Sequence, residues 1–128
     1  MHAPNSYDYA LIRLVPSVER GECLNLGVIL FCRTLDFLRA RIYLNAKRSL
    51  AVSPDLDLAA VQQQLDSIML ICNGAPEAGP LGKMSQSERF HWLVSPRSTT
   101  IQISPTHEGV CDDPEVALEH LMETMVLL

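Results

Sequence analysis

The stretch CLNLGVILFC, residues 23–32, decides the fold of this chain. It is almost entirely apolar, which is typical of a central strand that is covered on both faces. Gly27 inside it indicates a bulge or the close approach of another backbone segment. After a short connection, residues 37–44 alternate between apolar side chains and the larger polar side chains of Arg39, Arg41 and Tyr43. We therefore predict an antiparallel hairpin over residues 24–44.

Working outward, the pattern predicts a strand before this hairpin and a helix after it. The strand covers Tyr7 to Val15 and is stopped by Pro16. The helix begins near Ser53, a good N-cap, and ends at Gly74, a good C-cap. Its apolar stripe has the spacing of three and four residues that marks one face of a helix. The stripe consists of Leu58, Val61, Leu65, Ile68 and Cys72.

The C-terminal part of the chain predicts a second hairpin and a last helix. The hairpin strands are Arg89–Val94 and Thr99–Ile103, and a helix begins at Asp112 or Asp113 with Pro114 in its first turn. Residues 73–87 and 105–110 are expected to form loops. We predict an α+β fold, in which two hairpins and the N-terminal strand form an antiparallel sheet of about five strands and two main helices pack on one face. Residues 1–6 are expected to be a flexible N-terminus, and residues 7–128 a single domain.

The composition excludes several classes of protein. The 128 residues include 48% hydrophobic side chains and a formal net charge of −5, which excludes disordered and collagen-like chains. The acid excess makes nucleic acid an unlikely partner. No apolar run approaches the ~20 residues of a membrane helix, and no secretory signal is visible. The four cysteines form no Cys-x-x-Cys pair, so we expect reduced thiols and a cytoplasmic location.

The charge is unevenly distributed along the chain. Residues 1–50 carry seven basic and four acidic side chains, whereas residues 51–128 carry three basic and eleven acidic ones. This asymmetry allows a local basic face on the first hairpin. It also allows two opposite patches that meet in an oligomer or a complex.

The best polar candidate for a functional site lies in the predicted second hairpin. In a strand, Arg89 and His91 point to the same face, and the adjoining turn brings a second guanidinium and several hydroxyls. Such a group could bind phosphate or carboxylate, or take part in proton transfer. The alternative is that Arg89 pairs with a carboxylate and His91 lies on a solvated or helix-covered face. The candidate ligand-binding residues are Arg89, His91, Arg97, Ser98 and Thr99.

Other motifs predict no chemistry. Gly82-Lys83 lacks the strand and the earlier glycine of a phosphate-binding loop. His107 and Cys111 are too few for zinc, which takes about four ligands. No nucleophile elbow is present. We therefore predict no metal or cofactor and favour a non-enzymatic interaction or accessory module, with a protein partner or a second copy. The alternative is the anion-binding or enzymatic site around Arg89, His91 and Arg97.

Several segments of the chain resemble the domain-of-unknown-function 3037 family of uncharacterised bacterial proteins. The resemblance spans about residues 7–125, and it implies no catalytic residues, because no activity is established for the family. Genes of this family often lie beside one for a HipA-like kinase, so the resemblance implies such a kinase as a partner. The segments that carry it are YDYA at 7–10, ERGE at 19–22, NLGVILFC at 25–32, GPLG at 79–82, RFHWL at 89–93 and SPRST at 95–99.

Overall fold

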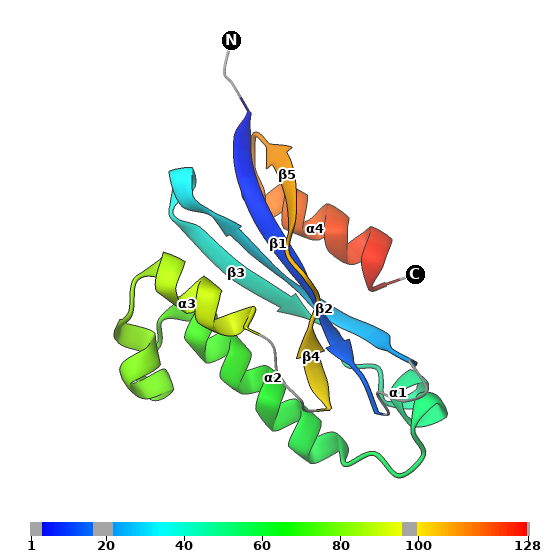
Figure 1. Ribbon diagram of the computed structural model, residues 1–128. Coiled ribbons are helices and arrows are strands. Elements are labelled where there is room, and N and C mark those ends of the chain that lie inside the picture. The colour runs from blue at the N-terminus through cyan, green and yellow to red at the C-terminus, as the bar shows by residue number, and fades with distance from the viewer. Residues whose placement is uncertain (1–3, 17–21, 96–99, 128) are drawn as a thin grey trace.

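The computed structural model describes residues 4–16, 22–95 and 100–127. In these ranges, five strands form one open sheet in the order β3-β2-β1-β4, and β5 also pairs with β1 (Figure 1). All the pairings are antiparallel, so the predicted α+β class and the five antiparallel strands are confirmed. The strands are β1 (Asn5–Leu14), β2 (Leu24–Cys32), β3 (Phe37–Ile42), β4 (Ile101–Ile103) and β5 (His107–Cys111).

The predicted first hairpin is confirmed as β2 and β3. The two strands pair from Gly27 opposite Ile42 to Cys32 opposite Phe37. A short 3-10 turn, η1 (Arg33–Leu35), and Asp36 connect them. Asp36 adopts a left-handed conformation with φ of 50°, which aspartate tolerates better than most side chains.

Gly27 marks a bulge, as the sequence predicts. The register between β1 and β2 shifts between Ile12 and Arg13, which pair with Gly27 and Asn25. A Cβ atom on Gly27 would lie 2.4 Å from the backbone oxygen of Arg41, so only glycine fits between the neighbouring strands. The bulge also changes which side chains of β2 face each layer. Leu26 and Ile29 therefore contribute to the same cluster although they are three residues apart.

Helices cover both faces of the sheet, which corrects the expected placement of both main helices on one face. One core cluster joins the sheet to α2 (Leu58–Asn73) and α3 (Gln86–Leu93), and the other joins it to α4 (Pro114–Met125) (Figure 1). The physical reason lies in β2, whose side chains are apolar on both faces and require cover on both. Val28, Leu30 and Cys32 pack against the α4 layer, with none exposed to solvent.

The predicted second hairpin is wrong. Residues 89–93 belong to α3, and β4 pairs with β1 instead. Ser85 caps α3, because its side-chain oxygen accepts a hydrogen bond from the backbone N–H of Glu88. The carboxylate of Glu88 accepts one from the backbone N–H of Ser85. This reciprocal capping box favours a helix. The alternation of apolar and polar residues over the six residues of the predicted strand is too short to exclude a helix. The fifth strand is β5, in a segment expected to be a loop.

The remaining elements differ from expectation mainly at their ends. α1 (Ala46–Val52) follows the hairpin, and a kinked 3-10 segment, η2 (Pro76–Lys83), occupies the expected long loop. α2 is capped by Asp57, four residues later than the expected Ser53, and it ends at Gly74 as expected. α4 begins at Pro114 after an Asp113 cap, also as expected.

Candidate functional site

Arg89 binds backbone carbonyls inside the protein. Its side chain is buried, and its Nη1 donates to the carbonyl oxygens of Ile71 and Cys72 at 3.0 and 2.9 Å. Its Nε donates to the carbonyl oxygen of Met84 at 3.1 Å. The guanidinium therefore donates to carbonyls in the last turn of α2, where Ile71 also accepts from the N–H of Gly74 at 3.1 Å, and it ties this end of α2 to α3. The sequence predicts either an external anion or a carboxylate as the partner of Arg89, and the structure shows three backbone carbonyls in their place.

Gly74 and Cys72 belong to the same arrangement. Gly74 has a φ of 63°, and a Cβ atom there would lie 2.7 Å from Nη1 of Arg89. Burial raises the pKa of the Cys72 thiol to about 12, although the nearby Arg89 charge lowers it. A thiol that stays protonated is a poor nucleophile, so this cysteine contributes packing.

The structure separates His91 from Arg89. Residues two apart on a helix do not share a face, so the strand geometry that would align them is absent. His91 is exposed, and its Nδ1 lies 2.7 Å from the carbonyl oxygen of Ser87. His91 lines a pocket of about 460 Å³ that also includes Arg33, Asp8 and Glu108. Arg97, Ser98 and Thr99 lie outside the described residues.

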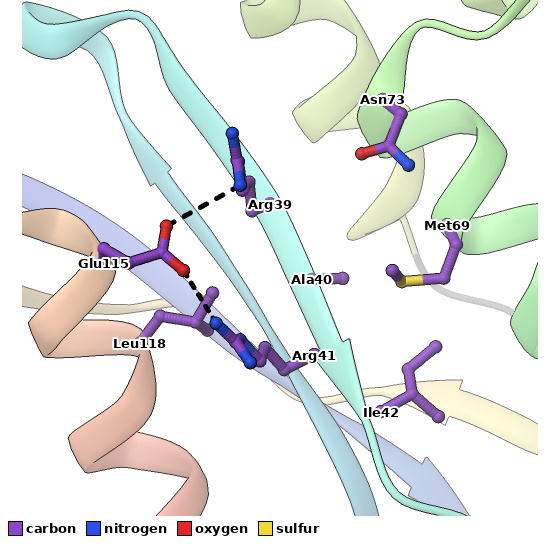
Figure 2. Close-up of a pocket in the computed structure, with 8 residues that line it drawn as sticks. All are labelled: Arg39, Ala40, Arg41, Ile42, Met69, Asn73, Glu115 and Leu118. Carbon is purple, nitrogen blue, oxygen red and sulfur yellow. Dashed lines mark hydrogen bonds and ion pairs between the residues drawn. The ribbon is translucent and has the colours of Figure 1, made fainter.

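A second pocket, of about 420 Å³, lies along the outer edge of β3 and was not predicted from the sequence. We call it the β3 groove. Figure 2 shows α4 on one side of β3 and α2 on the other, with side chains from both helices reaching towards the strand. It combines a charged side with an apolar side, because successive residues of β3 point to opposite faces. Its lining residues are Arg39, Ala40, Arg41, Ile42, Met69, Asn73, Glu115 and Leu118.

The charged side of the β3 groove joins the basic and acidic halves of the sequence. Nη2 of Arg41 lies 2.7 Å from Oε1 of Glu115 and 2.6 Å from Oε1 of Glu119. Nη1 of Arg39 lies 3.7 Å from Oε2 of Glu115, and the Arg39 side chain is 62% exposed. The opposite charges therefore meet within one molecule, between the first hairpin and α4. Arg41 is paired twice, whereas Arg39 shares one carboxylate at long range.

β3 is an edge strand, and it has no strand partner on its outer side in the described residues. Tyr43 donates its N–H to the carbonyl of Leu26 at 2.7 Å, so odd-numbered residues of the strand direct their backbone groups towards β2. The carbonyl of Arg41 faces Gly27, in agreement with this. Antiparallel alternation then directs the backbone groups of Ala40 and Ile42 outward. Within residues 4–16, 22–95 and 100–127, no hydrogen bond reaches these outward groups.

No helix in the described part of the chain has the length and apolar character needed to cross a membrane. The chain belongs to the family described as "Protein of unknown function (DUF3037)", whose model matches residues 9–126. This confirms the resemblance drawn from the sequence. No curated protein and no solved structure matched the chain. Family membership therefore brings no activity or site residues, and the proposals below rest on the geometry.

Proposed function

We propose that the protein is a non-enzymatic interaction module whose docking surface is the β3 groove. The observation that carries the proposal is the open edge of β3, at which the outward backbone groups of Ala40 and Ile42 lie between two helices. Unpaired strand edges are a common point of attachment for another chain, because they offer a ready row of donors and acceptors. The helices on either side limit access to an extended segment and supply side chains that can select it.

The surrounding chemistry supports binding over catalysis. Arg89, the most buried of the charged side chains in the described ranges, holds backbone carbonyls together. Cys72 keeps its proton, and Cys32 is buried. The β3 groove contains two arginines and a glutamate but no cysteine or histidine, so it offers ion pairing and hydrogen bonding. A HipA-like kinase stays the partner implied by the family resemblance.

The test compares proteins retained by the full chain and by Ala40→Pro. Proline removes the outward N–H of residue 40 and obstructs strand addition. Because Ala40 is buried in a core cluster, circular dichroism first verifies that Ala40→Pro folds as the parent does. Glu123→Ala, on the exposed face of α4, serves as the control. We expect a purified HipA-like kinase, or another protein from cells of the source, to bind the parent and the control and to lose Ala40→Pro. Equal retention by all three, or by none, would contradict the proposal.

A second candidate function is anion binding at the His91 pocket, because Arg33 and His91 line it together. Nη2 of Arg33 donates to Oγ of Ser87 at 3.4 Å, which leaves most of its donors available. Asp8 and Glu108 in the same pocket oppose an anion, so we rank this candidate second. Titration with inorganic phosphate, followed by NMR, should shift the His91 ring signals at millimolar concentration in the parent and not in Arg33→Ala. An unchanged spectrum of the parent would exclude it.

A further inference from the structure

We infer that the β3 groove takes an extended peptide strand from a different protein, in which acidic residues alternate with small or apolar ones. This inference rests on the proposed docking function and specifies the chemistry of the occupant. The expected sequence of the guest strand depends on which side chains line each side of the β3 groove. Residues directly opposite each other on paired strands project to the same face, so each guest side chain meets one β3 side chain.

On the α4 side, the guest strand would meet Arg39 and Arg41, together with Glu115, whose charge is paired with both arginines. Arg41 is satisfied by Glu115 and Glu119, at 2.7 and 2.6 Å. Arg39 has a single carboxylate at 3.7 Å, and more than half of its side chain is exposed. Arg39 is therefore the cation on this side that has capacity for a further carboxylate. An opposite charge placed across the strands stabilises the pair and a like charge destabilises it, so an acidic guest residue is favoured beside Arg39.

On the α2 side, the guest strand would meet a small surface that is apolar except for the exposed amide of Asn73. Ala40 is short and buried, and Ile42 and Met69, which are partly buried, line the β3 groove beside it (Figure 2). Methionine adapts its shape to different neighbours, so this side accepts alanine or a branched side chain such as valine. A carboxylate on this side would lose water against apolar atoms without gaining a cation. The two sides together specify the alternation.

A second copy of this chain is a poor occupant. When the β3 strands of two copies pair edge to edge about a two-fold axis, residues that lie opposite each other project to the same face. The two registers that pair the most residues place either Arg39 or Ala40 on the axis. The first places Arg39 opposite Arg39, and the second places Arg39 opposite Arg41. Both arrangements set arginine against arginine at cross-strand distance. Charge complementarity therefore favours a strand that supplies acids of its own.

The test measures binding of fluorescein-labelled seven-residue peptides to the full chain by anisotropy. The first peptide alternates valine with glutamate, the second alternates valine with lysine, and the third is the first with alternate amides N-methylated on its hydrogen-bonding edge. We expect the glutamate peptide to bind about ten-fold more tightly than the lysine peptide. The N-methylated peptide should lose binding, because it cannot donate to the strand edge. NMR amide shifts on binding should centre on Leu38, Ala40 and Ile42.

A charge-reversal variant gives the matched control. Arg39 is exposed, and its guanidinium carbon lies 5.6 Å from the centre of the Phe37 ring, so circular dichroism first verifies that Arg39→Glu folds as the parent does. We expect Arg39→Glu to reverse the preference, so that the lysine peptide binds more tightly. Lys83→Glu, a charge change of the same sign away from the β3 groove, should leave the preference as in the parent.

The outcomes separate this inference from the proposed function. If the glutamate and lysine peptides bind equally and shift the same β3 amides, the docking edge stands and the acidic preference is overturned. If no peptide shifts the β3 amides while Ala40→Pro still loses its protein partner, the extended-strand occupant is overturned and the docking function stands. If no peptide binds and Ala40→Pro keeps every partner, both are overturned.

Discussion

Arg89 and Arg41 show how one side-chain type serves two different purposes in this protein. Arg89 is 8% exposed and donates to three backbone carbonyls, so its charge compensates the end of a helix. Arg41 is 44% exposed and faces two carboxylates on α4. A buried hydrogen bond that is removed leaves its partners unsatisfied, whereas an exposed ion pair is replaced by water. The comparison predicts that removing the buried Arg89 side chain lowers the free energy of unfolding much more than removing the exposed Arg41 side chain does.

The largest effect is expected for Arg89→Ala. The carbonyls of Ile71, Cys72 and Met84 would each lose the arginine donor, and two of these hydrogen bonds are buried, so we expect a loss of about 3 kcal/mol in the free energy of unfolding. Urea titration followed by circular dichroism measures it. Arg33→Ala, an exposed change, is the control and should alter stability by less than about 0.5 kcal/mol. Equal effects of the two variants would show that the carbonyl contacts of Arg89 contribute little.

Gly74→Ala should have the next largest effect. A Cβ atom there would lie 2.7 Å from Nη1 of Arg89 on a residue with a φ of 63°, so both the backbone and the arginine would have to shift. We expect a loss of about 2 kcal/mol by the same titration. Gly79→Ala provides a comparison, since its φ is 68° but nothing lies within 4 Å of the added atom. A Gly79→Ala loss as large as that of Gly74→Ala would assign the effect to backbone strain alone.

Alkaline pH should weaken the same region through Cys72. Its pKa is raised from 9.0 to about 12 in the folded state, so the unfolded chain releases this proton first. The protonated Cys72 thiol makes its full contribution to the free energy of unfolding below pH 9. This contribution is lost as pH rises towards 12, by up to about 1.4 kcal/mol for each pH unit. Unfolding curves of the parent and of Cys72→Ala from pH 8 to 11 would measure the difference in slope. Parallel slopes would contradict the assignment.

The smallest effect is expected for Arg41→Ala. Its partners are more than two-fifths exposed, so we expect a loss below about 1 kcal/mol, which decreases further in 1 M salt. Thermal unfolding at low and high salt would measure it. If Arg41→Ala lowers the free energy of unfolding as much as Arg89→Ala does, the buried and the exposed arginine do not differ in how much they stabilise the fold.

The sequence predicted elements well where local signals agreed and failed where they did not. The first hairpin has an apolar strand, a turn and a clean alternation, and all three predict the same structure. At residues 85–94, the alternation predicts a strand, whereas the spacing of Ser85 and Glu88 predicts a capping box, and that box forms. The sequence therefore contains a local signal for α3. β5 carries little apolar pattern, because its residues are mostly half-exposed or exposed.

The candidate site shows a different limit. His91 was singled out and does line a pocket, but with Arg33, which is far from it in sequence. The β3 groove depends on α2 and α4 lying on opposite faces, and they are separated by 40 residues of chain. The periodicity of apolar residues shows which face of each helix is buried, but it does not predict which face of the sheet the helix covers. The apolar run of β2 requires cover on both faces, and that requirement was the available clue.

The sequence by itself determined the strands of the first hairpin, the glycine at the bulge, the helix cap at Gly74, the start of the last helix at Pro114, and the family of the chain. These depend on backbone preferences and side-chain patterns within a few residues of one another. Only the tertiary structure decided that Arg89 caps a distant helix, that the opposite charges meet across β3, and that its edge is open. These depend on which surfaces pack together, because burial and ion pairing act through space between residues that are far apart in the chain.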